Sequence, residues 1–200
     1  MYIVDDFFDN PDEIRSLALK QEYGKWGHDN YPGFRSKMIP LIDLNLWETL
    51  QSKLMSFPIC QKMGVNSMKA EFAYVPKNFG QGWPHVDDDA TIAGAIYLSP
   101  SPPMDSGTCF YEPKHPLQPH LKYDRTKFFM DPDRYYEEAM TVNKEIRSCY
   151  DQVHAVTNVY NRCAMWLSKI HHSEQKFFGK TIDDSRSVSY THLTLPTIGC

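Results

Sequence analysis

Residues 68–98 read MKAEFAYVPKNFGQGWPHVDDDATIAGAIYL, and this stretch decides the fold. Its first eight residues alternate between two faces, which predicts a half-buried strand. One face carries Met68, Ala70, Phe72 and Tyr74, and the other carries Lys69, Glu71 and Ala73. A turn-rich stretch at 78–82 follows, and the dense apolar run at 90–98 then predicts a strand buried on both faces. The stretch therefore indicates a protein built on strands.

Further short strand patterns occur at 107–112, 153–160 and 162–167. Strand runs separated by turn signals indicate an antiparallel sandwich or barrel with helices packed against one face. Between them, residues 113–150 are rich in proline and charge and contain a helical pattern at 134–146. This segment is too small to have its own core, so we interpret it as an insertion or lid.

The N-terminal part, residues 1–66, predicts helical support for the sheet. Asn10 can cap a helix that begins at Pro11, and Glu13 completes the capping pattern. A second amphipathic helix is predicted over 44–57, where leucines and a tryptophan recur on or near one face.

Composition excludes several classes of protein. Hydrophobic residues make up 42% and charged residues 23% of the 200 positions, as in ordinary globular chains. No apolar run is long enough to span a membrane, and the first residues do not form a secretory signal. The net charge of −4 argues against nucleic-acid binding. Five cysteines without paired spacing predict free thiols, so we expect a cytoplasmic chain.

The segment Trp83-Pro-His-Val-Asp-Asp-Asp89 carries the candidate chemistry. On a strand, His85 and Asp87 point to the same face and can reach one metal ion. A second histidine source, His171-His172, follows a later strand, and Arg186 lies 14 residues beyond it. Two histidines and one carboxylate that leave positions open are the ligands of non-haem Fe(II) oxygenases. The arginine would suit the far carboxylate of a dicarboxylate cosubstrate.

These motifs together resemble the 2-oxoglutarate- and Fe(II)-dependent dioxygenases, in particular the prolyl-4-hydroxylase-like branch of bacteria and phages. The matching pieces, over roughly 66–186, are His85-x-Asp87, the strand at 91–98, Gly107-Thr108-x-Phe110, Asn161-Arg162, His172-Ser173 and Arg186. The resemblance implies a mainly β (α+β) fold with a double-stranded β-helix core, of the jelly-roll or cupin type. It also implies an oxidoreductase that uses O₂, decarboxylates 2-oxoglutarate to succinate and CO₂, and hydroxylates a substrate C–H bond.

The resemblance also implies roles for single residues. His85, Asp87 and His172 would bind Fe(II), and His172 is preferred to His171 because the family's distal histidine usually precedes a small residue. Arg186 would pair with the C5 carboxylate of 2-oxoglutarate, and Tyr74 would donate its hydroxyl to the same molecule. Asp87 favours hydroxylation, because halogenases of this class have a small residue at that position.

Each role has a plain alternative. His85 and Asp87 could be a surface hydrogen-bonded pair, Arg186 could pair with a nearby surface aspartate, and Tyr74 could be a core residue. His192 shows no partner pattern.

The tail departs from the family pattern. After Arg186 the family continues with a strongly apolar strand, whereas residues 187–200 are rich in serine and threonine and resemble translated sequencing-adapter ends. We interpret this tail as non-native and expect the closing strand to be missing or replaced. The expected organisation is one oxygenase domain at 1–186, with helical support at 1–66, the β-core at 67–112 and 151–186, and the insertion or lid at 113–150.

Other functions fit parts of the sequence. A non-catalytic β-sandwich that binds a ligand, a phage interaction protein and a zinc hydrolase are the alternatives. For the oxygenase, the sequence predicts a small-molecule or peptidyl substrate and no membrane partner. The insertion is the expected source of specificity, because loops on a rigid scaffold carry recognition.

Overall fold

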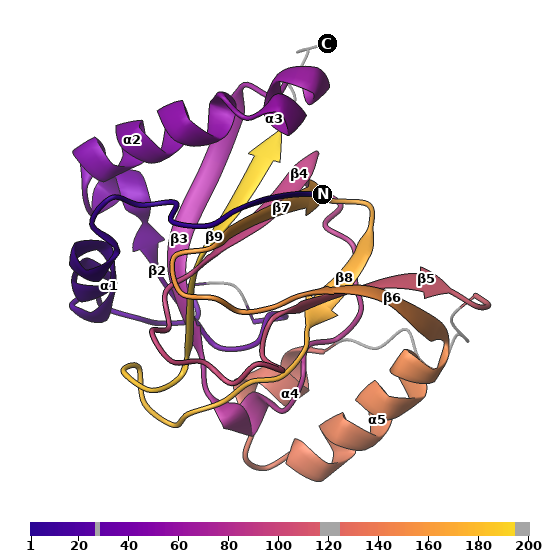
Figure 1. Cartoon of the computed structure of the whole chain (residues 1–200). Coiled ribbons are helices and arrows are strands. Elements are labelled where there is room, and N and C mark those ends of the chain that lie inside the picture. The colour runs from indigo at the N-terminus through magenta and orange to yellow at the C-terminus, as the bar shows by residue number, and fades with distance from the viewer. Residues whose placement is uncertain (27–28, 117–124, 195–200) are drawn as a thin grey trace.

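The chain is built around a six-stranded antiparallel sheet (Figure 1). The computed structural model describes residues 1–26, 29–116 and 125–194. The strands lie in the order β1-β7-β4-β9-β3-β2. In that order they span Tyr2–Val4, Cys163–Leu167, Ile92–Tyr97, Arg186–Thr194, Ser67–Val75 and Phe34–Met38.

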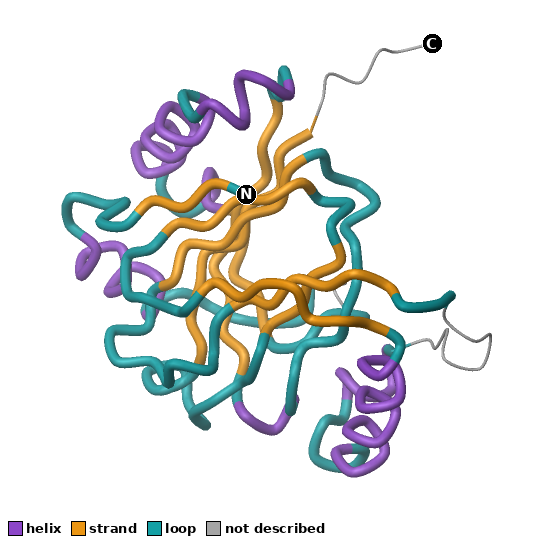
Figure 2. Tube along the Cα trace, turned by 45° about the vertical axis from the view of Figure 1, so that its right-hand side comes forward, coloured by secondary structure: helices purple, strands orange, loops and turns teal. Residues whose placement is uncertain are grey.

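A second, three-stranded antiparallel sheet faces the first. Its order is β6-β5-β8, with bounds Tyr150–Val156, Thr108–Pro113 and His171–Glu174. Figure 2 shows its strands crossing below those of the larger sheet. Phe110 of β5 and Val156 of β6 share one buried cluster with Ala95 and Trp166 of the larger sheet. Two antiparallel sheets packed in this way confirm the predicted mainly β, jelly-roll architecture.

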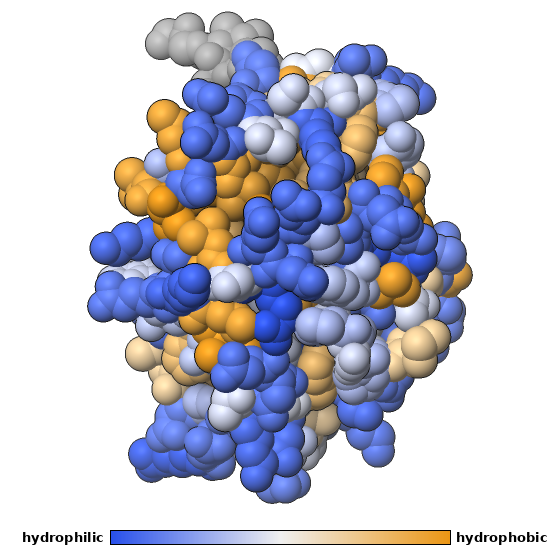
Figure 3. Space-filling model, turned by 60° about the vertical axis from the view of Figure 1, so that its left-hand side comes forward, coloured by the Kyte–Doolittle hydropathy of each residue, from blue (hydrophilic) through white to orange (hydrophobic). Residues whose placement is uncertain are grey.

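Helices cover the outer face of the larger sheet. They are α1 (Pro11–Leu19), α2 (Leu44–Met55) and α3 (Pro58–Met63), with single 3₁₀ turns at Ile39–Leu41 and Lys77–Phe79. Figure 3 brings the side with α1 and α2 forward and shows hydrophobic patches among mainly hydrophilic side chains. No helix in the described ranges has the length and apolarity needed to cross a bilayer.

The helix termini follow local chemistry. Asp43 caps α2 by accepting a hydrogen bond from the Leu46 amide at 2.9 Å. α2 ends at Met55, two residues before the predicted end, and Pro58 begins the short helix α3. Pro11 occupies the first position of α1 as predicted, but Asn10 makes no side-chain cap hydrogen bond, which corrects that expectation.

The alternation read at 68–75 fixes which side of β3 meets the helices. Met68, Ala70 and Phe72 are buried in the cluster beneath α1 and α2. Ala73, on the opposite face, is buried between the two sheets. Lys69 and Glu71 share the face of Ala73 and line a cavity between the sheets.

The insertion at 113–150 packs onto the smaller sheet. It contains α4 (Thr126–Met130) and α5 (Tyr136–Ser148), the latter close to the start of β6. Phe128 and Phe129 of α4 and Val142 and Ile146 of α5 are buried in one apolar cluster. Residues 117–124 lie outside the described part of the chain. The described helices are therefore anchored to the core and not suspended above it.

The closing strand, expected to be missing or replaced, is a strand in the structure. β9 lies between β3 and β4 and pairs with both along most of its length. Its unusual composition shows on the helix-facing side, where Ser189 and Thr191 are buried with hydroxyls that have no hydrogen-bond partner. Serine and threonine at these positions explain why the sequence lacks the apolar pattern of a closing strand. The non-native origin of residues 187–200 stays our interpretation.

Candidate metal centre

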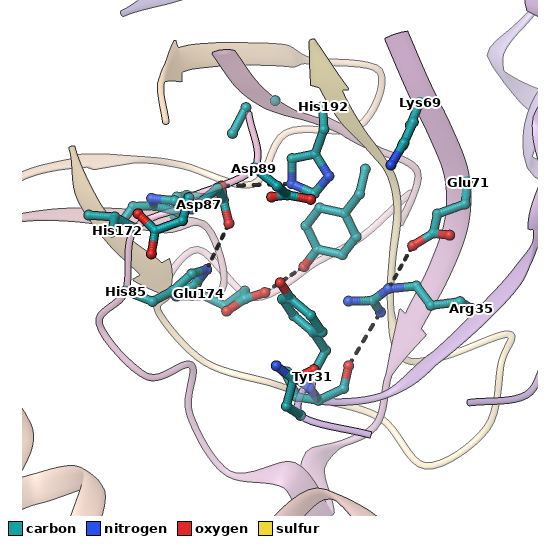
Figure 4. Close-up of a pocket in the computed structure, with 18 of the residues that line it drawn as sticks. Tyr31, Arg35, Lys69, Glu71, His85, Asp87, Asp89, His172, Glu174 and His192 are labelled. Carbon is teal, nitrogen blue, oxygen red and sulfur yellow. Dashed lines mark hydrogen bonds and ion pairs between the residues drawn. The ribbon is translucent and has the colours of Figure 1, made fainter. Parts of the chain in front are cut away.

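Two histidines and one aspartate converge beside β8 (Figure 4). His85 and His172 are joined by two backbone hydrogen bonds, with N–O distances of 3.0 and 2.9 Å. The Asp87 carboxylate oxygens lie 3.6 Å from His85 Nε2 and 3.3 Å from His172 Nε2. All candidate ligand atoms fall within 4.8 Å of one another, which fits a single metal ion. The structure thus brings together the three residues singled out from the sequence.

Backbone carbonyls orient both imidazole rings for this purpose. His85 Nδ1 lies 2.7 Å from the Trp83 carbonyl oxygen, and His172 Nδ1 lies 2.9 Å from that of Ile170. A carbonyl only accepts hydrogen bonds, so each Nδ1 carries the proton and each Nε2 presents a lone pair. Metal-binding histidines are usually held in this way by a partner on the other ring nitrogen.

The electrostatics favour the metal-binding ionisation states of His85 and Asp87. Burial, with His172 next to it, lowers the pKa of His85 to about 4, so this ring is neutral at physiological pH. Burial acts to raise the pKa of Asp87, but the adjacent imidazoles of His172, His192 and His85 outweigh it and hold the pKa below the ordinary value. A neutral imidazole and an ionised carboxylate are the forms that coordinate a cation.

The neighbouring candidates lie outside the triad. His171 points away from Asp87, and its ring lies 5.1 Å from that of Tyr150. Asp88 forms an ion pair with Lys169 at 2.6 Å at the exposed rim. Because side chains alternate along β8, only His172 of the two adjacent histidines shares the face of the metal site.

One arginine of the insertion ties together the two segments that carry the histidines. The Arg147 guanidinium donates to the Gly82 and Glu174 carbonyls at 2.7 and 3.2 Å, and to the Ser173 hydroxyl at 3.0 Å. It also donates to the Tyr111 hydroxyl at 2.6 Å. Gly82 precedes His85 by three residues and Ser173 follows His172 directly, so Arg147 fixes the spacing of both ligand-bearing segments.

A cavity of about 820 Å³ opens in front of the triad. Figure 4 shows Lys69, Glu71 and Arg35 across the cavity from the metal site, and Tyr31 pointing into it. Arg35 is neutralised by Glu71 through a contact of 3.1 Å. This volume is sufficient for a cosubstrate and a second small molecule.

Arg186 is buried behind the cavity wall. Its side chain donates to the Ser106 carbonyl at 3.2 Å and to the Tyr190 hydroxyl at 2.9 Å, while Nη2 has no partner. Tyr190 in turn donates to the Glu174 carboxylate at 2.6 Å. Glu174 and Tyr190 line the cavity and stand between it and Arg186. The structure therefore places Arg186 near the metal site but screens it with a carboxylate.

Tyr74 lies on the other face of β3. Its ring packs against Tyr23 and Phe34, at centroid distances of 5.0 and 5.1 Å, and it does not line the cavity. This position supports the alternative interpretation of Tyr74 as a packing residue.

Glu174 and His192 are cavity residues that sequence reasoning missed. Glu174 follows His172 by two positions and therefore shares its face of β8. His192 Nε2 lies 3.7 Å from Asp87 Oδ2 and shares a face of β9 with Arg186. Strand alternation could have found both, but for His192 only after the tail had been recognised as a strand.

Several solved structures share this fold. HygX from Streptomyces hygroscopicus, solved with nickel and 2-oxoglutarate bound, matches with a TM-score of 0.60 at 11% identity, over 98% of this chain and 82% of HygX. A Pseudomonas putida prolyl-4-hydroxylase matches with a TM-score of 0.55 at 13% identity, over 98% and 92% of the two chains. The α-ketoglutarate-dependent carbocyclase SnoK of nogalamycin biosynthesis matches with a TM-score of 0.54 at 13% identity, over 96% and 78%. The resemblance noted from the motifs is thus confirmed in the fold.

Sequence comparison gives a family without an assigned activity. No curated protein matches the chain. Residues 1–184 match the sequence profile described as "Family of unknown function (DUF6445)". This match spans both sheets up to the start of β9 and all three candidate metal ligands. The chain therefore belongs to the DUF6445 family, whose fold in this member is that of the 2-oxoglutarate-dependent oxygenases.

Proposed function

We propose that this chain is an Fe(II)- and 2-oxoglutarate-dependent oxygenase that uses O₂ to hydroxylate a small-molecule or peptidyl substrate. One observation carries the proposal: two Nε2 lone pairs and one ionised carboxylate converge on an open cavity. The related fold of HygX, which was solved with nickel and 2-oxoglutarate bound, supports the same cofactors. Fe(II), when bound, supplies the chemistry that couples O₂ and the decarboxylation of 2-oxoglutarate to succinate and CO₂ with C–H hydroxylation.

The residues present fit this metal. His85, Asp87 and His172 would hold Fe(II), and the remaining coordination positions would face the cavity. All three ligands are oxygen or nitrogen donors that a borderline metal such as Fe(II) accepts. The retained carboxylate of Asp87 supports hydroxylation in preference to halogenation.

The buried Arg186 could bind 2-oxoglutarate only after a rearrangement of its neighbours. The unpartnered Nη2 of Arg186 is a buried donor suited to the C5 carboxylate. Glu174 lies in front of it, and its pKa stays below the ordinary value because Arg186, His85 and the Tyr190 hydroxyl outweigh the effect of burial. The C5 carboxylate would therefore reach Arg186 only when the Glu174–Tyr190 pair moves aside.

We also propose that residues 1–186 form a single oxygenase domain with the insertion at 113–150 as the source of specificity, and that the protein works in the cytoplasm. The four described cysteines are buried free thiols, which supports a reducing compartment.

Thermal unfolding under anaerobic conditions tests the function. Mn(II) or Fe(II) is expected to raise the midpoint, and 2-oxoglutarate is expected to raise it further only when metal is present. His172→Ala should abolish both shifts, whereas His171→Ala, the matched control, should retain them. Shifts that survive in His172→Ala, or no metal effect on the wild type, would favour the non-catalytic alternative.

A further inference from the structure

Arg125 lines the cavity on the insertion side. Arg125 directly precedes α4, and its guanidinium lies 5.4 Å from the centre of the Trp83 ring. Its Nη2 donates one long hydrogen bond, 3.4 Å, to the carbonyl of Pro84, the residue before His85. Arg125 is therefore attached to the segment that carries the first metal ligand.

Within residues 1–26, 29–116 and 125–194, no carboxylate lies within 4.0 Å of this guanidinium. Two other arginines of the chain do pair with carboxylates: Arg35 with Glu71 at 3.1 Å, and Arg162 with Asp5 at 2.6 Å. Burial lowers the pKa of Arg125, with opposing contributions from Tyr150, Tyr31 and Glu174. A guanidinium has five N–H donors, and among the described residues the side chain of Arg125 makes a single hydrogen bond while it lines the cavity.

Burying a charged guanidinium without an anionic partner costs free energy. An anion in the cavity would offset this cost, because a carboxylate can accept two parallel hydrogen bonds from a guanidinium. The cavity also contains the carboxylates of Glu71, Asp87, Asp88, Asp89 and Glu174. A doubly charged phosphate would be repelled by these groups more strongly than a singly charged carboxylate. The charge pattern therefore favours a monoanionic carboxylate.

We propose that Arg125 binds a carboxylate of the primary substrate, which places that substrate among carboxylic acids such as amino acids or peptides with an acidic group. The distinction between this primary substrate and a cosubstrate rests on the oxygenase function proposed above. Arg125 comes from the insertion, beside Trp83 and Pro84, whereas Arg186 comes from β9 in the larger sheet. The two arginines thus offer separate carboxylate sites for substrate and cosubstrate.

Calorimetric titration tests the proposal on the Mn(II)-loaded chain, saturated with 2-oxoglutarate under anaerobic conditions. The probes are a panel of N-acetylated amino acids, each paired with its neutral amide. We expect acids to bind and their amides not to bind. Arg125→Gln should weaken acid binding by about tenfold to a hundredfold and leave 2-oxoglutarate affinity unchanged. Lys127→Gln is the matched control, because Lys127 carries the same charge in the same helix but is exposed and paired with Glu138. It should bind acids like the wild type.

Three outcomes would overturn the assignment: acids and amides bind alike or not at all, Arg125→Gln binds acids like the wild type, or the variant loses 2-oxoglutarate instead. The last outcome would make Arg125 part of the cosubstrate site. The same titration on the metal-free chain separates the two proposals. If Mn(II) never binds but acids still bind through Arg125, the carboxylate site stands and the oxygenase function falls.

Discussion

Replacing Arg147 by methionine should weaken both the fold and the metal site. Methionine keeps the apolar stem but removes a partly buried guanidinium that makes five hydrogen bonds of 2.6–3.2 Å, the fifth to Asn143. Hydrogen bonds to a charged group contribute about 1.5–3 kcal/mol each, and their contributions are not additive, so the loss of this set should cost about 3 to 5 kcal/mol. Against a total stability of about 5–15 kcal/mol, this is a large loss that should still leave a folded population.

The effect on metal binding follows from the same contacts. Without Arg147, the side-chain link between the Gly82 and Ser173 segments is lost and the backbone hydrogen bonds between them remain, so the two histidine rings are held less firmly. Loss of an orienting partner typically weakens metal affinity about 10–100-fold. Mn(II) titration at low temperature, where the variant remains folded, measures the loss of metal affinity. Urea unfolding measures the loss of stability.

Lys144→Met on the same helix is the control, because Lys144 is exposed. It should change the unfolding free energy by less than about 0.5 kcal/mol and leave Mn(II) affinity unaltered. If Arg147→Met lost less than about 1 kcal/mol and bound Mn(II) like the wild type, the positioning role of Arg147 would be refuted.

Three further predictions concern stability. Thr191→Val should raise the unfolding free energy in urea by about 1 to 2 kcal/mol, because it removes a buried hydroxyl without a partner, while Thr49→Val on exposed helix surface should not. In the unfolded chain His85 has its ordinary pKa of 6.5, whereas in the folded chain its pKa is about 4. Between these two pH values the unfolded chain binds a proton at His85 that the folded chain does not bind. The free energy of unfolding of the metal-free chain should therefore rise by about 2 to 3 kcal/mol between pH 4 and 6.5 and stay constant above pH 6.5. Urea unfolding at a series of pH values measures this rise, and His85→Gln should remove most of it. Gly107→Ala should cost at least about 3 kcal/mol, because its Cβ would overlap a backbone oxygen of β6; Gly64→Ala has open space but a φ of 65° and should cost about 1 kcal/mol in the same assay.

The sequence predicted the parts of the fold that depend on local patterning. Alternation over 68–75 predicted β3 and its two faces, and α2 begins at the expected residue. Alternation cannot say which face meets the helices and which meets the cavity, because that depends on strand order in the sheet. Tyr74 shows the consequence: it shares a face with Phe72, and only the packing of α1 and α2 on that face shows that Tyr74 is turned away from the metal site.

The site was predictable where ligands lie close in sequence and unpredictable where they meet through the sheet. His85 and Asp87 are two residues apart, and strand alternation predicted their common face, although the structure has only an isolated bridge at His85 and no strand there. Glu174 and Tyr190 meet only because β8 and β9 belong to different sheets that face each other. The weak apolar pattern of β9 concealed that strand, because its helix-facing positions hold serine and threonine.

The insertion contacts both the segments that carry the candidate metal ligands and the cavity. Arg125 lies at the start of α4 and lines the cavity, while Arg147 lies near the end of α5 and bonds the residues next to both histidines. Removal of a lid that contacts only the ligand would change substrate specificity and leave metal binding intact. Here one segment supplies both a cavity wall and the spacing of the ligands. Replacement of Arg147 should therefore alter metal affinity, whereas replacement of Arg125 should alter substrate binding alone.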